Sequence, residues 1–414
     1  MMSSSKRKSV MPSCGEAEVF PSSKRKKAVL SLCAGLLPDD MMSEDFSGLH
    51  MATCKVLPVP PAAKLLVVSP TEKLDSATVC SYSPSGLRDD LLFTIDCARP
   101  NSVEVVTPSS CCGLTLVYDA AALAYYVCNA ATRAITRVPP YRDPTHASSA
   151  GLGFDARTRE YKVVRLINGY SHEQEAVRCD VYTPGADCWR PATGRLPFRW
   201  TMSVVSAVNH AMMNRTQPVF ANGFLHWLIS PALLGRRPRA AVISFSVAEE
   251  TFGCIRSPPF WEPKEHLRPW SQSEGEHLVV MDDQVCIVRN LRNGTPHGSA
   301  LEIWGLLDYG SGGTLNHRID LFGHIRRELG EPQVVRVIGS LGNRRSGKKI
   351  VIATSKHWVY EKFHKKVYTY DPSCQVLEEM LSVTETHDSV ERWIPGSRFS
   401  LVEESLAPVH KVVE

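Results

Sequence analysis

Two glycine-rich stretches have the spacing of nucleotide-binding loops. Residues 342–349 fit the G-x-x-x-x-G-K pattern of a phosphate-binding loop, but Lys349 occupies the position where Ser or Thr would bind magnesium. Residues 151–156 fit G-x-G-x-x-A. Both stretches run into strand-like segments, so neither is followed by a helix N-terminus that could hold phosphate. We therefore expect hairpins at both places and no nucleotide or other cofactor.

Catalytic and metal-binding patterns are also missing from the sequence. The 14 histidines are dispersed, and G-x-S-x-G, H-E-x-x-H and C-x-x-C do not occur. The 13 cysteines, including the adjacent pair Cys111-Cys112, are interpreted as reduced thiols that act as small core hydrophobes. The four acidic pairs are expected to be solvated turn charges, since adjacent strand residues point to opposite faces; they are Asp89-Asp90, Glu249-Glu250, Asp282-Asp283 and Glu378-Glu379. No catalytic or metal site is predicted, and the chain is not expected to be an enzyme.

A basic segment opens the chain. Residues 1–27 lack hydrophobic periodicity and are predicted to be disordered. Against two glutamates they hold seven basic residues in two clusters, namely Lys6, Arg7, Lys8, Lys24, Arg25, Lys26 and Lys27. Two basic clusters about 15 residues apart are typical of a bipartite nuclear import signal. We expect an import receptor as a partner and a nuclear and cytoplasmic distribution; a solvated tail without an address is the alternative.

Charge and hydropathy exclude two classes of partner. The net charge of the chain is +4, and residues 1–27 contribute +5, so the rest is close to neutral. A near-neutral body argues against a surface that coats nucleic acid. The apolar run Ala28–Leu37 is half the length that a membrane span needs. Neither nucleic acid nor a membrane is therefore predicted as a partner.

From about Leu65 onward the sequence has the texture of an all-β protein. Short runs rich in β-branched and aromatic residues alternate with Gly, Pro, Asn and Asp turns. The clearest runs are 64–69, 113–118, 161–166, 240–246, 277–281, 284–288 and 349–354. One segment, Asp320–Leu329, is typical of a helix. Regularly spaced strands are compatible with a sandwich, a barrel or a propeller.

An internal repeat favours the propeller. A strand that ends in an aromatic or apolar marker residue and is followed by a turn recurs six times, at Tyr82, Cys128, Tyr182, Phe245, Trp304 and Tyr370. The markers are 46 to 66 residues apart, which is the size of a kelch-type blade with insertions. The sequence therefore predicts a β-propeller of six to seven four-stranded blades, whose closure hides the sheet edges.

Several motifs resemble the F-box-associated domain of plant F-box proteins. They follow in order as Ser110–Leu114, Tyr126–Arg133, Gly151–Asp155, Tyr161–Arg165, Asn222–Leu228 and Leu301–Trp304. The resemblance covers roughly residues 65–409. In the fourth and fifth motifs it is most specific, and Asn222-Gly223 supplies the φ > 0 turn of a hairpin. We divide the chain into a basic tail (1–27), an F-box remnant and linker (28–63) and the propeller-like domain (64–409).

The F-box that precedes this domain in the family is incomplete here. Its opening is matched by Leu37, Pro38, Asp39 and Asp40, but the apolar helices that follow in the family are missing. The resemblance implies a substrate-recognition subunit of an SCF (cullin–RING) ubiquitin ligase that binds a Skp-type adaptor and a protein target. A remnant of one short helix cannot form a core alone, so adaptor binding is expected to be weak. The alternative is an F-box-less protein that binds targets without delivering ubiquitin; a propeller enzyme ranks below both.

Three irregular stretches are candidate target-binding loops, because propellers bind through the loops at their rims. The stretches are 191–218, 257–275 and 307–318. Their aromatic residues are of the kind enriched in binding hot spots, namely Phe198, Trp200, Phe260, Trp261, Trp270 and Tyr309. For Trp261 and Trp270, packing between blades is an equal alternative. Trp189, Trp227 and Trp304 are assigned to packing.

Overall fold

The computed structural model divides into two compact units, Met1–Thr53 and Cys54–Glu414, and the second contains all the residues that can be described. These are residues 63–409 except for gaps at 72, 74, 98, 100–101, 142–146, 169–176, 195, 197–200, 215, 230–239, 257–275, 293–298, 307–312, 331–332, 344–346, 359–361, 387–397 and 404. The import clusters, the F-box remnant and the six aromatic loop residues lie outside the described residues.

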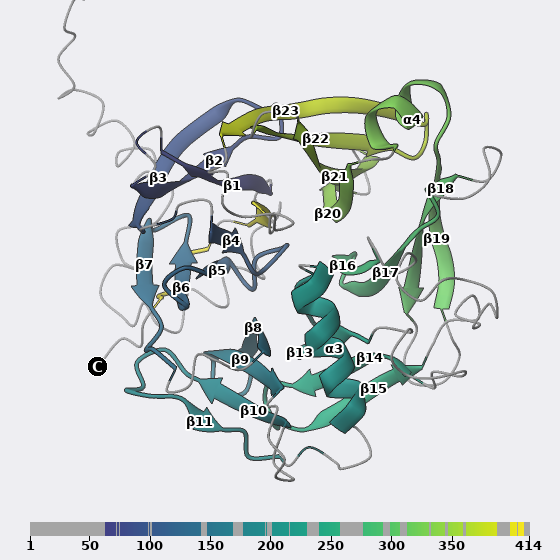
Figure 1. The fold of residues 1–414 in the computed structure, drawn as a ribbon. Helices are drawn as coiled ribbons and strands as arrows, with labels where there is room; N and C mark the ends of the chain where they lie inside the picture. The colour runs from purple at the N-terminus through teal and green to yellow at the C-terminus, as the bar shows by residue number, and fades with distance from the viewer. Residues whose placement is uncertain are drawn as a thin grey trace, which may run out of the picture. The chain divides into compact units, whose positions relative to one another are not determined.

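The second unit is a ring of six four-stranded antiparallel sheets (Figure 1), which we call blades A to F. Blade A comprises β24 (Phe399–Val402), β1 (Lys64–Pro70), β2 (Ser76–Tyr82) and β3 (Arg88–Asp96). Blade B comprises β4 (Val103–Val105), β5 (Leu114–Asp119), β6 (Ala124–Asn129) and β7 (Ala134–Arg137). Blade C comprises β8 (Ala147–Asp155), β9 (Glu160–Asn168), β10 (Val177–Tyr182) and β11 (Arg190–Pro191).

The remaining blades follow the same order around the ring. Blade D comprises β12 (Val219–Ala221), β13 (Phe224–Leu228), β14 (Ala240–Ser246) and β15 (Phe252–Arg256). Blade E comprises β16 (His277–Met281), β17 (Gln284–Asn290), β18 (Ala300–Leu306) and β19 (Gly313–Asp320). Blade F comprises β20 (Val334–Asn343), β21 (Gly347–Trp358), β22 (Lys362–Asp371) and β23 (Val376–Thr386). The all-β propeller fold is thereby confirmed, with six blades.

The repeat found in the sequence has a simple structural meaning. The six marker segments lie on or at the end of β2, β6, β10, β14, β18 and β22, which are the third strands of the six blades. The first strand of a blade lies nearest the centre of the ring, as β4, β8, β16 and β20 show in Figure 1. The repeat could be found in the sequence because every blade has the same strand order.

Several hairpins share one turn geometry. Five turns begin with Asp, Asn or Ser and end four residues later with a non-glycine residue at φ between +50° and +59°. In each, the first side-chain oxygen accepts a backbone N–H two or three residues further on. The turns are 119–123, 129–133, 155–159, 246–250 and 371–375. This is the type I turn with a left-handed final residue that suits a hairpin. The predicted Asn222-Gly223 turn is also confirmed, with φ values of +52° and +83°.

The ring is closed by its C-terminal strand. β24 pairs with β1, so residues from the two ends of the described chain share blade A. Further bonds join the C-terminal segment to blade B: the Ser400 hydroxyl donates to Thr107 O at 2.7 Å, and the Asn129 side-chain amide donates to Ala407 O at 2.6 Å. Blade A is thereby completed by strands from both ends of the described chain, which closes the ring.

Apolar side chains fill the spaces between neighbouring blades. Buried clusters join blades A and B, C and D, D and E, E and F, and F and A. Trp227, on β13, is 1% exposed within the cluster between blades C and D. These clusters, rather than one central core, hold the ring together.

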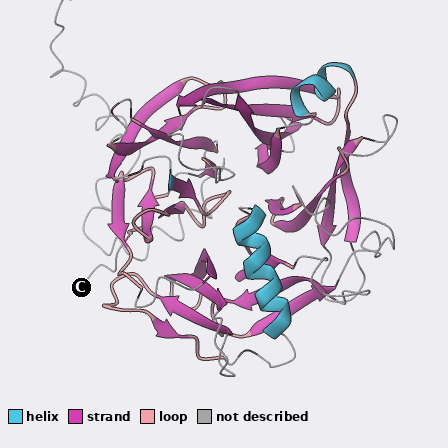
Figure 2. Ribbon diagram, in the orientation of Figure 1, coloured by secondary structure: helices cyan, strands magenta, loops and turns pink. Residues whose placement is uncertain are grey.

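Among the described residues, two helices interrupt the strands (Figure 2). α4 (Gly323–Leu329) lies within the predicted helical segment but begins later, because β19 continues to Asp320. α3 (Thr201–Asn214) contradicts the prediction of an irregular stretch. Its buried apolar residues recur at the spacing of one helix face, namely Val204, Ala207, Val208 and Ala211. The β-branched residues Thr201, Val204, Val205 and Val208, which lower helix propensity, concealed this pattern.

Candidate functional site

The connections that contain the predicted loops lie on two different faces of the ring. Since adjacent strands alternate in direction, the link from the last strand of one blade to the first of the next always lies on one face. α3 lies in one of these links, so we call this side the α3 face. The strand ends that flank 197–200 and 257–275 lie on the α3 face, whereas those that flank 307–312 lie on the opposite face. The topology therefore separates the predicted loop around Tyr309 from the other two.

The tryptophans assigned to packing do pack. Trp227 is buried, and its indole N–H donates to Ser149 Oγ at 3.1 Å. The indole N–H of Trp189 donates to Pro139 O at 2.9 Å, and that of Trp304 donates to Glu302 Oε2 at 3.0 Å. Both of these rings are partly buried. Their role in packing is confirmed.

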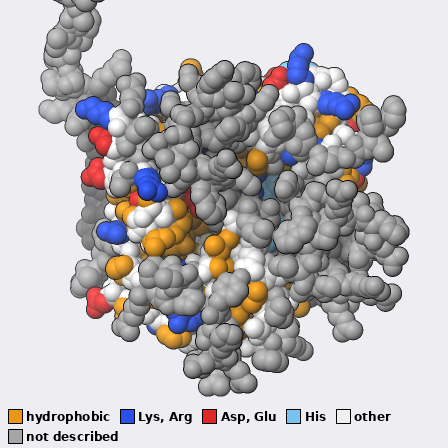
Figure 3. Space-filling view, in the orientation of Figure 1, with side chains coloured by type: hydrophobic (Ala, Val, Ile, Leu, Met, Phe, Trp, Pro, Cys, Tyr) orange, Lys and Arg blue, Asp and Glu red, His pale blue; other side chains and the backbone are white. Residues whose placement is uncertain are grey.

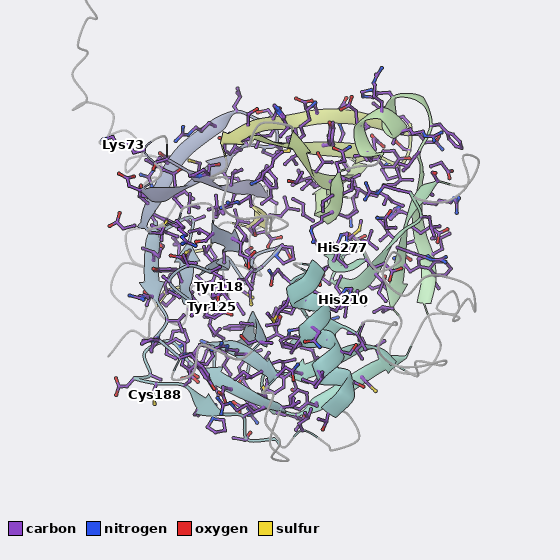
Figure 4. The ribbon with its side chains drawn as sticks, in the orientation of Figure 1. Lys73, Tyr118, Tyr125, Cys188, His210 and His277 are labelled. Atoms are coloured by element: carbon purple, nitrogen blue, oxygen red, sulfur yellow. The ribbon has the colours of Figure 1, made fainter. Side chains whose placement is uncertain are left out.

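On the α3 face, charged and aromatic side chains from four blades and α3 form a group linked by ring contacts, hydrogen bonds and longer-range electrostatic interactions. We call it the α3-face cluster; its members are Glu104, Tyr118, Tyr125, Tyr141, Arg165, Arg178, His210, Glu276 and Arg336. Four of its members are buried, namely Glu104, Tyr125, Arg165 and His210. Figure 4 shows His210 near the centre of the ring and Tyr118 and Tyr125 between the centre and the edge. Histidines are visible at the centre of this face, and lysines and arginines lie mainly around its edge (Figure 3).

The tyrosine half of the cluster lies where blades B and C meet. The rings of Tyr118 and Tyr125 stack with centroids 4.5 Å apart. The guanidinium of Arg165 lies 4.1 Å from the centroid of the Tyr141 ring, and its Nε donates to Ser148 Oγ at 2.9 Å. A cation over an aromatic face is attracted by the ring quadrupole. Tyr125 and Arg165 are 8% and 6% exposed, so Tyr118 and Tyr141 are the partly exposed aromatic residues of this half.

Tyr141 connects this half to solvent. Its hydroxyl donates to Asp180 Oδ2 at 2.6 Å, and the guanidinium of Arg178 donates to the same hydroxyl. Burial, reinforced by Asp180, raises the pKa of Tyr141 to about 12, so the ring stays neutral. The side chain of Arg178 is 49% exposed. An exposed guanidinium beside a fixed tyrosine is a suitable contact for a partner protein.

The other half of the cluster surrounds His210 of α3. Its Nε2 donates to the backbone O of Glu276 at 3.4 Å, and burial lowers its pKa to about 4. Burial also lowers the pKa of Arg336 to about 10, although nearby Glu104 opposes the shift. At the start of β16 in blade E, the imidazole of His277 accepts the N–H of Val337 in blade F at 2.9 Å and so links the two blades. At neutral pH His210 is therefore uncharged and Arg336 is a cation.

Glu276 is the titratable member at neutral pH. Burial raises the pKa of its carboxyl to about 7, and the attraction of Arg289 only partly opposes this. A cationic group of a partner that approached Glu276 would favour the carboxylate form. The cluster thus offers aromatic faces, fixed cations and one carboxyl of adjustable charge. Such an arrangement favours recognition of a polar surface.

One acidic pair was misinterpreted from the sequence. Glu250 is 3% exposed and lies between Lys162 and Arg190, whereas Glu249 is exposed as expected. The cations come from blade C, about 60 to 90 positions earlier in the chain. No local pattern marks such a residue. The α3-face cluster was missed for the same reason, since its members come from separate strands.

Metal and membrane features are not found in the part of the chain that can be described. Within it, no three His, Cys, Asp or Glu side chains are grouped in a way that could hold a metal ion. Of the described helices, none has the length and apolar character needed to cross a bilayer.

The fold is a six-bladed β-propeller whose α3 face carries a group of charged and aromatic side chains. Residues 70–304 match the model of the F-box associated beta propeller domain. That match covers more than half of the chain, and the chain therefore belongs to this family.

Curated relatives are F-box proteins of Arabidopsis thaliana. One is 30% identical over 120 residues, which cover 26% of this chain and 30% of that protein. The F-box protein CPR1 is 24% identical over 203 residues, which are 44% of each chain. F-box/WD-40 repeat-containing protein 1 is 25% identical over 135 residues, covering 32% of this chain and 31% of that protein. The matches therefore span less than half the length of these relatives.

Solved structures give weaker similarities. A chain in the crystal structure of a nidogen/laminin complex has a TM-score of 0.39 and 11% identity, with 83% of this chain and 99% of that chain covered. TolB from Acinetobacter baumannii has a TM-score of 0.38 and 9% identity, with 85% and 71% covered. Neither similarity bears on the function of this chain.

Proposed function

We propose that the chain is a non-enzymatic protein-recognition module that binds a target protein with the α3 face of its propeller. The observation that carries the proposal is the family match over 70–304, since the curated relatives are named F-box proteins. Arg178 supports it, because its side chain is 49% exposed on the α3 face beside Tyr141, and arginine and tyrosine are enriched in binding hot spots. The predicted loops at Phe198, Trp200, Phe260, Trp261 and Trp270 would add aromatic contacts on the same face.

The finer proposal is a substrate-recognition subunit of an SCF ubiquitin ligase. Leu37, Pro38, Asp39 and Asp40 match the opening of an F-box and would contact a Skp-type adaptor. The missing apolar helices favour the second candidate, an interaction protein that binds its target without delivering it for ubiquitin transfer. A stable protein interface buries about 1,200–2,000 Å² in total, more than one or two helical turns can supply.

A titration of the purified full chain with a Skp-type adaptor distinguishes the two candidates. We expect binding at least about a hundredfold weaker than that of a relative with an intact F-box, a loss of about 2.7 kcal/mol. Restoring an intact F-box between Glu44 and Asp45 should recover the affinity, because the added helices would supply the interface area that the remnant lacks. Binding of ordinary strength by the unchanged chain would contradict the second candidate and favour the SCF subunit.

We also propose that the chain is distributed between nucleus and cytoplasm. The support is the pair of basic clusters at 6–8 and 24–27, which an import receptor would bind as an exposed strand of charges. The test is given with the predictions below.

A further inference from the structure

Cys111 and Cys112 lie together in the connection between β4 and β5 of blade B, on the face opposite α3. The Cys111 N–H donates to Leu114 O at 2.8 Å, and the Leu114 N–H donates back to Cys111 O at 3.0 Å. Cys112 and Gly113 have φ values of +46° and +87°, which identifies a tight turn of the primed type. Cys111 is 2% exposed, whereas Cys112 is exposed. The expectation that the cysteines are core hydrophobes therefore fails for Cys112, Cys188 and Cys374, which are all exposed.

The two cysteines of this turn are adjacent and differ in exposure: Cys111 is buried and Cys112 faces solvent. The neighbouring Cys111 thiol lowers the pKa of Cys112, against the opposing effects of burial and of Glu403. Burial first, and then Cys112, raises the pKa of Cys111. The geometry therefore offers an accessible thiol at Cys112 next to a buried thiol at Cys111. Redox-sensitive cysteines have this arrangement of an accessible thiolate beside a resolving thiol.

The turn is also attached to the segment that closes the ring. The Ser110 N–H donates to Leu401 O at 2.7 Å, and the Glu403 N–H donates to Ser110 Oγ at 3.1 Å. A methyl group added to Gly113 would lie 2.1 Å from Ser405 Cβ, so this turn and the C-terminal segment are in close contact. On its other side, the Tyr161 hydroxyl of blade C donates to Cys112 O at 3.1 Å. A change in the conformation of the turn would therefore disturb its contacts with the C-terminal segment that closes the ring.

We propose that Cys111 and Cys112 form a reversible thiol oxidation site that responds to a hydroperoxide. The Cys112 thiolate attacks the outer oxygen of the hydroperoxide, the O–O bond breaks, and Cys112 becomes a sulfenic acid as the alcohol or water leaves. The Cys111 sulfur then attacks the sulfur of Cys112. The S–O bond breaks, water carries away the hydroxyl and the Cys111 proton, and a disulfide joins the adjacent residues. A cellular thiol reverses the step by thiol–disulfide exchange.

The disulfide changes the turn because adjacent residues are too close for relaxed geometry. Neighbouring Cα atoms lie about 3.8 Å apart across a trans peptide. Disulfides usually join residues whose Cα atoms are about 4.4–6.8 Å apart. The backbone of the turn must therefore rearrange, which weakens the bonds to Leu114 and Tyr161 and the contact with Ser405. Oxidation is expected to loosen the closure of the ring around 399–409.

The test uses the unmodified full chain, with Cys188 and Cys374 as internal controls. The chain is treated with limiting hydrogen peroxide, the remaining thiols are alkylated, and peptides are quantified by mass spectrometry. In the peptide with Cys111 and Cys112 we expect a mass loss of two hydrogens and a loss of alkylation. This loss of alkylation should be at least about tenfold faster than that of Cys188 and Cys374. Dithiothreitol should restore both thiols. Loss at the same rate as Cys188 and Cys374, or sulfenic acid that persists without the disulfide, would overturn the proposal.

Two further readouts separate the chemistry from a folding defect. Cys111→Ser should stop the reaction at a Cys112 sulfenic acid that dimedone traps, and Cys112→Ser should abolish oxidation of Cys111. If either variant misfolds, phenylarsine oxide, which bridges neighbouring thiols, tests the unmodified chain and should protect this pair alone from alkylation. Hydrogen exchange within 399–409 should accelerate on oxidation and recover on reduction. Unchanged exchange would contradict the link to ring closure.

Discussion

Glu250 is the residue whose removal should destabilise the ring most through charge. It sits in the turn after β14 of blade D and reaches across to blade C. Lys162 Nζ lies 3.2 Å from its Oε1, and Arg190 donates to both of its oxygens at 2.8 and 2.5 Å. The Thr193 N–H also donates to Oε2 at 2.9 Å. Lys162 is bonded in addition to Asp155 Oδ2 at 3.1 Å and to Val247 O at 2.8 Å.

Glu250→Gln keeps the shape of the side chain and removes its charge. Lys162, whose side chain is 7% exposed, would then have Asp155 as its one anionic partner in this cluster. Removing one partner of a buried ion pair costs about 3–5 kcal/mol of unfolding free energy. Because the amide can still accept one hydrogen bond, we expect about 3 kcal/mol, the lower end of that range.

Glu378→Gln is the matched control. Glu378 Oε2 and Lys349 Nζ are 2.7 Å apart, but their side chains are 58% and 41% exposed. An exposed pair contributes about 0–1 kcal/mol, so this variant should unfold almost as the unmodified chain does. Urea unfolding at neutral pH, with equal slopes for the three proteins, measures both losses. A loss below about 1 kcal/mol for Glu250→Gln would refute the assignment of a buried, structural ion pair.

The unmodified chain and Glu250→Gln should also differ in how their unfolding free energy depends on pH. Burial by itself would raise the pKa of Glu250, but the bonds from Arg190, Thr193 and Lys162 outweigh it and lower the pKa from 4.5 to about 2. A carboxyl whose pKa is lower in the folded state stabilises the fold above its unfolded pKa and loses that effect as the pH falls. The difference in stability between the unmodified chain and Glu250→Gln should therefore be complete above about pH 5 and shrink toward pH 2.

Three further predictions concern other parts of the chain. Trp227→Ala should lower the unfolding free energy by about 3–5 kcal/mol, because the ring is buried between blades C and D; Leu123→Ala, at an exposed turn, should change it by less than about 0.5 kcal/mol, and equal losses in urea titrations would contradict this packing. Deleting residues 399–414 removes β24 and should broaden the calorimetric transition and lower its midpoint, since β1 keeps β2 but loses its other neighbour; an unchanged transition would show that closure does not stabilise the ring. Changing residues 24–27 to Ala should move a tagged chain toward the cytoplasm, and imaging that shows an unchanged distribution would remove the import signal.

The fold was largely predictable because its information is local and repeated. Each third strand carries an aromatic or apolar marker residue, and each turn from Asp119 to Gln375 that has the shared geometry specifies its own hairpin within five residues. Asn222-Gly223 is read in the same way from two residues. Repetition over six blades then excluded a sandwich, since a closed ring is what needs this period.

Features that depend on distant partners were not predictable. Glu250 looks like any acidic turn residue until Lys162 and Arg190 are brought against it from blade C. His210 of α3 and Arg336 of blade F influence each other electrostatically only because the fold brings these two elements toward each other. α3 itself was hidden by a β-branched sequence whose helical period appears only at the residues that pack against blades C and D.

The measurement that tests the central claim most directly compares two charge reversals on opposite faces. Arg178→Glu alters the α3 face, and Lys349→Glu alters the other face; their side chains are 49% and 41% exposed, so both changes should be tolerated by the fold. Proteins bound to each tagged full chain in cell extract are quantified against the unmodified chain, after calorimetry shows equal folding.

We predict that Arg178→Glu lowers the recovery of the specifically bound target at least about tenfold, equivalent to about 1.4 kcal/mol, whereas Lys349→Glu leaves it unchanged. Equal recovery with both variants, or a loss confined to Lys349→Glu, would contradict recognition by the α3 face.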